Sequence, residues 1–121
     1  LIIVIVQIIL GTAVREQTDE ISKALNYQNR EQWIGRMDND FFIHRSFSWI
    51  VAAACVFLFL KSRPVPSFRR HAFAVLSFML IAFGAGLAMF FMHIPAWAQP
   101  LHLLFASLLA ISLFSFRLQM K

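Results

Sequence analysis

The sequence predicts an all-α integral membrane protein built as a four-helix bundle. Of its 121 residues, 60% are hydrophobic and 14% are charged, and so few charged groups cannot cover a soluble globule of this size. The hydrophobic residues gather in four runs, at about 1–14, 41–60, 72–92 and 97–116. Because a membrane-spanning helix needs about 20 such residues, each run is predicted to be one span or part of one.

The first run, 1–14, is shorter than the other three and begins without a methionine in the middle of an apolar stretch. We interpret it as the remainder of a helix whose start is missing, and the chain as a fragment of a larger protein. A cleavable signal peptide is the alternative, but the run has neither a basic start nor a small-residue cleavage site at its end.

The predicted external loop, 15–40, is longer than a simple connection between adjacent spans requires. Residues 15–25 are mostly good helix formers, so we expect the first helix to continue into water. The remainder is expected to fold back over the external ends of the helices, with Trp33 at the membrane interface. Asp38 and Asp40 are more simply a cap of the next helix than an acid/base pair.

Charge placement predicts the orientation of the chain in the membrane. All six acidic residues lie in the 15–40 loop, whereas the 61–70 loop has four basic residues and no acidic one, and Arg117 and Lys121 lie on its side. By the positive-inside rule the 61–70 loop is cytoplasmic and the 15–40 loop external. The expected location is a bacterial plasma membrane, or the mitochondrial inner membrane in a eukaryote. Topology and contact with anionic membrane lipid explain the net charge of +5, so no nucleic-acid partner is expected.

The third and fourth runs carry signals for close packing and for a helix start. Glycine and alanine dominate residues 82–86, which permits close approach of a neighbouring helix or a ligand. Pro100 fits the first turn of a helix that begins near residues 97–98.

Two of the four histidines are predicted to share one ligand. His44 lies four residues beyond Asp40, about 6 Å at ~1.5 Å rise per residue, and His102 lies five beyond Trp97, roughly 7 to 8 Å. Both are near the external ends of their runs, where a polar group is expensive and tends to be functional. One such histidine alone is more simply a hydrogen-bonded packing residue. Two at matched depth on neighbouring helices can hold a flat iron porphyrin between them.

The other residue types favour haem over zinc at such a site. Zinc needs three or four ligands, no carboxylate falls in an apolar run, and the single cysteine, Cys55, has no partner. Haem needs two axial nitrogens, an apolar slot and cations for its propionates. Arg15 and Arg45 are the candidate cations, since guanidinium groups match carboxylates, although either can be a simple interface anchor. His71 is most simply a solvated helix end, and His93 can be interfacial, a hydrogen-bond partner or a support for a ligand.

Four segments of the sequence together resemble the haem A synthase family, also called the COX15/CtaA family. They are residues 7–15 (QIILGTAVR), the pair His44-Arg45, Gly86, and residues 100–104 (PLHLL). Proteins of that family have eight spans in two similar four-helix halves, each half with a histidine pair on its second and fourth helices. The chain resembles the carboxy-terminal half over essentially its whole length, which implies that it is half of an eight-helix pseudo-symmetric protein.

The resemblance implies an oxidoreductase that converts the C8 methyl group of haem O to a formyl group, giving haem A for cytochrome oxidase. The carboxy-terminal half is similar to a cytochrome domain that holds haem b, with His44 and His102 as axial iron ligands and Arg15 and Arg45 near the propionates. Substrate haem O and the acidic residue needed for oxidation belong to the amino-terminal half. No catalytic residue is therefore assigned within this chain. The implied partners are the other half, an electron donor and haem O synthase.

Two departures from the family pattern are visible. Some members have cysteine pairs in their external loops, and the 15–40 loop has none, which leaves open a subtype without loop disulfides. A glutamate found three residues before the histidine in the amino-terminal half is replaced by Phe41, as expected for a carboxy-terminal half.

Two other functions stay open on the sequence. One is a stand-alone membrane cytochrome b that carries electrons, which would lack a preceding four-span half with its own histidine pair. The other is a non-haem membrane scaffold or assembly subunit, whose histidines only make hydrogen bonds and which would not retain haem.

Overall fold

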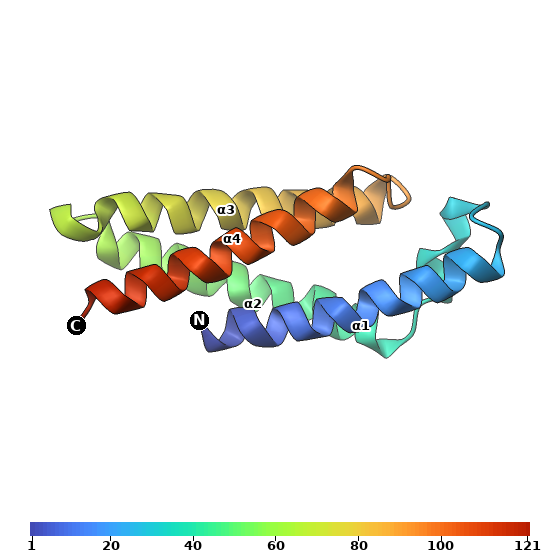
Figure 1. The fold of residues 1–121 in the computed structure, drawn as a ribbon, viewed down its shortest axis with the longest axis horizontal. Helices are drawn as coiled ribbons and strands as arrows, with labels where there is room; N and C mark the ends of the chain where they lie inside the picture. The colour runs from blue at the N-terminus through green and yellow to red at the C-terminus, as the bar shows by residue number, and fades with distance from the viewer.

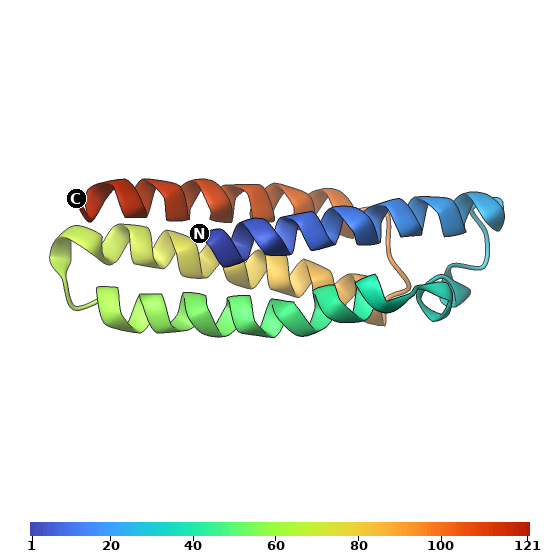
Figure 2. The same ribbon diagram turned by 90° about the horizontal axis from the view of Figure 1, so that it is seen from below.

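A computed structural model describes residues 1–121, and every element in it is helical, as predicted (Figure 1). The four long helices pack side by side, α1 along α2, α2 along α3, and α3 along α4 (Figure 2). In chain order the elements are α1 (Ile2–Ala24), the short 3₁₀ helices η1 (Arg30–Gln32) and η2 (Ile34–Arg36), α2 (Asn39–Ser62), α3 (Pro66–Phe91) and α4 (Ala98–Gln119).

Three of the helices, α2, α3 and α4, are long and apolar enough to cross a membrane. Large apolar side chains such as Phe57, Leu80 and Ile111 are exposed, as expected for contact with lipid. The apolar part of α1 covers only residues 2–14, roughly 20 Å at 1.5 Å per residue, which is less than the ~30 Å thickness of a bilayer core. From Arg15 onward α1 carries charged residues, so its second half is suited to water.

The helix boundaries follow local sequence signals. Asp38 caps α2, since its Oδ1 accepts a hydrogen bond of 2.9 Å from the backbone N–H of Asp40, which confirms the predicted cap. Pro66 begins α3, and Pro100 lies in the first turn of α4, where the missing N–H of proline costs no helical hydrogen bond. The first helix continues to Ala24, as the helix-forming residues after Val14 predicted.

The segment between α1 and α2 folds back onto the turn between α3 and α4, as expected. Trp33 and Met37 form a small buried cluster with Ile94 from that turn. Trp33 was expected at the membrane interface, and its side chain, only 4% exposed, packs against protein in this cluster. Its indole N–H donates to the Gln28 carbonyl, and the Arg30 guanidinium lies 4.7 Å from its ring and donates to the Ile94 carbonyl.

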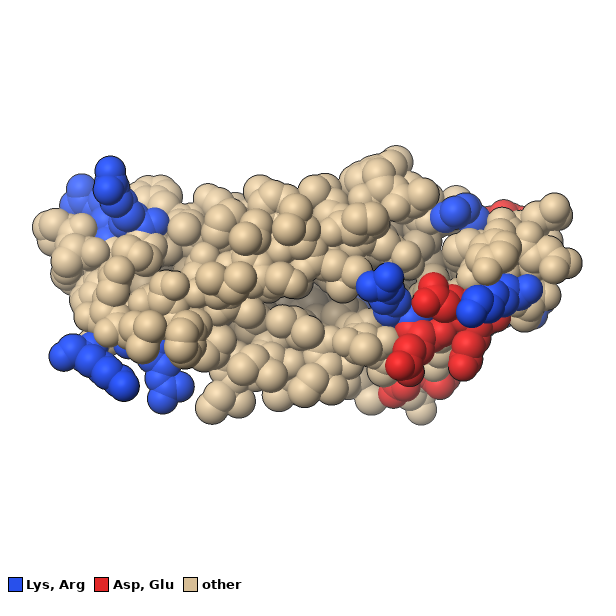
Figure 3. All heavy atoms as spheres, viewed as in Figure 1, with Lys and Arg blue, Asp and Glu red and all other residues tan.

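Charged side chains lie at the two ends of the bundle, and the middle of the face shown has none (Figure 3). Acidic groups gather only around the α1–α2 connection, and the end that carries the α2–α3 turn and the carboxy terminus shows only basic groups. The orientation of the chain in the membrane was predicted from this same separation of acidic and basic residues. It leaves an uncharged middle zone that a bilayer core can surround.

Candidate functional site

The structure brings His44 and His102 together at one end of the bundle. His44 lies in the second turn of α2 and His102 in the second turn of α4, and both helices begin at the same end (Figure 2). The two imidazole centroids are 6.2 Å apart, with an angle of 82° between the ring planes. The two histidines, which were paired because of their similar predicted depth in the membrane, are therefore neighbours in space.

Each of the two imidazoles packs against a glycine on an adjacent helix. A Cβ atom on Gly11 of α1 would lie 3.1 Å from Cε1 of His44, and a Cβ atom on Gly86 of α3 would lie 3.4 Å from Cε1 of His102. The first distance is shorter than an ordinary contact, so a methyl group there would force the His44 ring to shift, whereas the second is an ordinary van der Waals contact. Glycine at these two positions thus lets each ring lie directly on the backbone of the neighbouring helix.

The two rings differ in their hydrogen bonds. Nδ1 of His102 lies 2.6 Å from the carbonyl oxygen of Ala82, so the Nδ1–H tautomer donates there and leaves the Nε2 lone pair free. Nδ1 of His44 is buried and has no partner. A metal-bound histidine is commonly oriented by a hydrogen bond from its other ring N–H to a nearby acceptor such as a backbone carbonyl.

A cavity of about 420 Å³ separates the helices around the two histidines. This volume falls within the range of roughly 300–1,000 Å³ that is typical of cofactor and ligand sites. Most of the lining is apolar, and it includes aromatic rings from both sides of the bundle: Phe41, Phe83, Phe90 and Phe91. The cavity is therefore a mostly apolar slot whose lining includes both imidazoles.

Arg15 and Arg45 both line this cavity, as a role near an anionic ligand group requires. The Arg45 guanidinium carbon lies 5.4 Å from the centroid of the Phe90 ring and 5.6 Å from that of Phe42, so two aromatic faces hold the cation in place. Both arginines are exposed to solvent on one side. They are the two side chains in the lining that carry a permanent charge.

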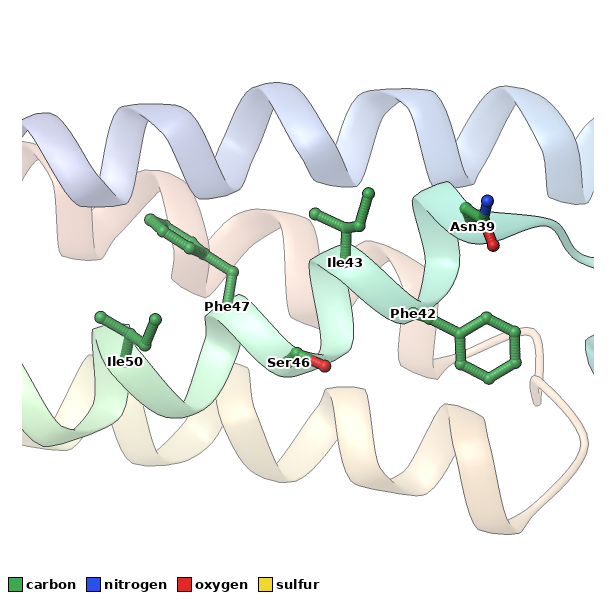
Figure 4. A pocket seen from close by; sticks show the side chains of 6 residues that line it. All are labelled: Asn39, Phe42, Ile43, Ser46, Phe47 and Ile50. Atoms are coloured by element: carbon green, nitrogen blue, oxygen red, sulfur yellow. The ribbon is translucent and has the colours of Figure 1, made fainter.

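A second hollow, of about 440 Å³, lies on the outer face of α2 (Figure 4). All of its lining comes from this one helix: Asn39, Phe42, Ile43, Ser46, Phe47 and Ile50. It contains no charged or titratable side chain and neither histidine. This shallow surface is suited to lipid or to another apolar helix, and we do not regard it as a chemical site.

The remaining histidines and the cysteine lie away from the slot. His71 contacts Gln119 at the opposite end of the bundle, with 2.9 Å between His71 Nε2 and the amide nitrogen, and His93 is exposed in the α3–α4 turn. Cys55 is buried in the apolar core. No three His, Cys, Asp or Glu side chains cluster together. The donor set at the slot is thus a pair of imidazoles.

The geometry of this donor set fits a two-imidazole axial pair. With metal–nitrogen bonds of about 2 Å on either side of one metal, the centroids of the two rings lie roughly 6 Å apart. The observed centroid separation is 6.2 Å. The apolar slot, the glycine contacts and the unpaired Nδ1 of His44 agree with a planar metal cofactor held between the rings.

Sequence reasoning gave no site role to two residues of α1 that touch His44. Gly11 packs against its ring, and the side-chain N–H of Gln7 donates a 3.0 Å hydrogen bond to its backbone carbonyl. A signal was present, since Gln7 is the one polar residue among the first ten. It lies four residues before Gly11 and eight before Arg15, which places all three on one face of a helix.

Comparison with known proteins yields one match. The sequence model of the COX15-CtaA family, described as "Cytochrome oxidase assembly protein", matches residues 1–114. No curated protein and no solved structure matches the chain.

Proposed function

The chain belongs to the COX15-CtaA family of cytochrome oxidase assembly proteins, and on that premise we propose that it is the haem b-binding half of a haem A synthase. The observation that carries the proposal is the pair His44 and His102, whose rings face one apolar cavity with centroids 6.2 Å apart. Two observations together favour haem over any other cofactor. The family assists assembly of cytochrome oxidase, and the cavity has two imidazoles in its lining.

In this proposal, His44 and His102 would hold the haem, each through its Nε2. Gly11 and Gly86 allow the two rings to sit deep between the helices, and the Ala82 carbonyl fixes the orientation of His102. The apolar lining excludes water from the porphyrin faces. A bound haem b supplies reversible one-electron chemistry at the iron.

Arg15 and Arg45 are proposed to bind the haem propionates. A guanidinium donates two parallel N–H groups to a carboxylate, and stacking of Arg45 on Phe42 and Phe90 holds its plane ready for this contact. The two charges would fix which edge of the porphyrin faces the external end of the bundle.

Oxidation of the haem O methyl group is proposed to occur in the other four-helix half. No Asp or Glu is among the residues that line the cavity, so its lining offers no carboxylate to act as a base. Turning a methyl into a formyl group adds one oxygen atom and removes electrons and protons, so it requires a redox partner. We propose that this half passes those electrons between the oxidation site and that partner, and that an enzyme producing haem O supplies the substrate.

The membrane is proposed to be the bacterial plasma membrane or the mitochondrial inner membrane, where cytochrome oxidase resides. Three apolar helices suit such a location. The basic end with the α2–α3 turn then faces the cytoplasm or matrix.

The proposal is tested by haem A formation in membranes that contain the intact protein. We expect His44→Ala and His102→Ala each to lower conversion of haem O to haem A at least ~10-fold, by loss of an interaction worth more than about 1.4 kcal/mol. His93→Ala is the matched control, because His93 is exposed and outside the cavity. Haem A formation at the wild-type rate in both cavity variants would contradict the proposal.

A further inference from the structure

The two halves of the site repeat one arrangement. Gly11 on α1 and Gly86 on α3 both meet Cε1 and Nδ1 of their histidine: Nδ1 lies 3.6 Å from the Cβ position of Gly11 and 3.5 Å from that of Gly86, and Nε2 of His44 lies 3.8 Å from the Gly11 position. Both Nδ1 atoms therefore lie beside the neighbouring helix. In one half, the residue four positions before the glycine provides the acceptor, since His102 donates to the carbonyl of Ala82.

Gln7 occupies the equivalent position in the other half, four residues before Gly11. Its side-chain N–H already donates to the His44 carbonyl over 3.0 Å, which holds its carboxamide beside His44. Two buried atoms in this contact lack a partner: Oε1 of Gln7, an acceptor, and Nδ1 of His44, a donor when Nε2 is a ligand. Burying both groups unpaired is costly, and pairing them removes both costs at once.

We propose that Gln7 is the positioning residue of His44, and that its Oε1 accepts a hydrogen bond from the His44 Nδ1–H when Nε2 binds the haem iron. This inference rests on the proposed function, because it assumes a bound haem. The new hydrogen bond requires the Gln7 carboxamide to turn Oε1 toward the ring, which exchanges the present bond to the His44 carbonyl for one to its imidazole. The two axial ligands then have different acceptors, a side-chain amide for His44 and a backbone carbonyl for His102.

Such an acceptor fixes the tautomer and the ring orientation and makes the imidazole a stronger electron donor to iron. Substitution at position 7 should therefore change the midpoint potential of the haem as well as its affinity. Gln7→Leu removes the acceptor and should shift the midpoint potential to more positive values. Gln7→Glu provides a stronger acceptor and should shift it to more negative values.

The matched control is Gln99, which lines the same cavity. Gln99→Leu and Gln99→Glu make the same changes of polarity and charge without altering an amide that contacts His44. The experiment is a spectroscopic redox titration of the intact, haem-loaded protein and of these four variants, with electron paramagnetic resonance of the oxidised haem. We expect opposite shifts in the two Gln7 variants, each larger than in its Gln99 counterpart, and haem affinity about 10-fold lower in Gln7→Leu.

The outcomes separate this inference from the proposed function. If the wild type shows a bis-histidine haem but the Gln7 variants shift no more than the Gln99 variants, Gln7 does not position His44 and the proposed function stands. If the folded wild type binds no haem, the proposed function itself fails. A purely structural role for Gln7 would lower haem content in both variants without moving the midpoint potential in opposite directions.

Discussion

The imidazole of His44 lies with its centroid 6.2 Å from that of His102, although the two residues belong to helices that are not consecutive in the chain. Their meeting depends on the two flanking helices, because each ring packs on a glycine of α1 or α3. The bundle therefore places two imidazoles side by side in the lining of one apolar cavity, and this pair is the basis of the proposed haem site.

Glycine 11 provides a direct test of this packing. In Gly11→Ala the new methyl group would lie 3.1 Å from His44 Cε1, so the ring must shift and haem affinity should fall several-fold. Gly84→Ala is the control, since a Cβ there meets nothing within 4 Å, and alanine should stabilise that helix by about 0.5–1 kcal/mol. Haem titration and thermal unfolding of the two variants measure both effects. Equal haem affinity in the two proteins would show that Gly11 does not shape the site.

Removing the charge of Arg45 should weaken haem binding. Arg45→Gln loses the cation proposed to meet a propionate, and loss of one charge-assisted hydrogen bond should raise the dissociation constant about 10-fold, or about 1.4 kcal/mol. Arg36→Gln, at an exposed position outside the cavity, should leave the dissociation constant unchanged. The measurement is a titration of the apoprotein with haem. Comparable weakening in both variants would point to net charge and exclude a specific contact of Arg45.

Trp33 should hold the external segment closed over the cavity. Trp33→Ala removes a 4%-exposed side chain from the cluster with Met37 and Ile94, and a large buried aromatic typically contributes about 3–5 kcal/mol. We expect faster amide hydrogen exchange in residues 26–38 and faster loss of haem. Tyr27→Ala, where the side chain is 63% exposed, should change neither rate. Unaltered exchange in the Trp33 variant would refute this role of the cluster.

The cap of α2 should depend on pH. Hydrogen bonds from the Gln17 side chain and from the Asp40 backbone N–H hold the pKa of Asp38 below its usual value. A carboxyl with a depressed pKa stabilises the fold above its unfolded pKa of about 3.9, and this contribution is lost as pH falls through the lower, folded value. The protection of the Asp40 amide, measured as its exchange rate relative to the intrinsic rate at the same pH, should therefore decrease only below about pH 4. In Asp38→Asn, which retains a capping oxygen, protection of that amide should no longer depend on pH in this range.

Composition and local signals predicted most of the fold. Three apolar runs of about 20 residues identify α2, α3 and α4, because a membrane-spanning helix needs this length. Aspartate and proline residues mark where these helices begin. Matching the depths of His44 and His102 worked because helix rise is constant, so position along the sequence converts to position along the membrane normal.

Contacts between elements could not be predicted in the same way. The first half of α1 has Gln7 as its one polar side chain before Gly11, and a single polar group marks one face of a helix without showing which neighbour that face meets. The sequence therefore did not reveal that Gln7 and Gly11 face His44. Trp33 was assigned to the interface from its residue type, but its burial depends on how the segment folds onto Ile94. Both features depend on relative placement, which local propensity does not determine.

The most direct test of the bis-histidine site is a pair of absorption spectra, oxidised and dithionite-reduced, of the detergent-purified chain with His44→Ala and His102→Ala beside it. The chain should show a low-spin b-type spectrum, and each variant should lose it, since one imidazole leaves the iron without a second axial ligand. A folded wild-type chain that carries no haem after expression with ample haem would contradict the account. So would a low-spin spectrum that survives either substitution.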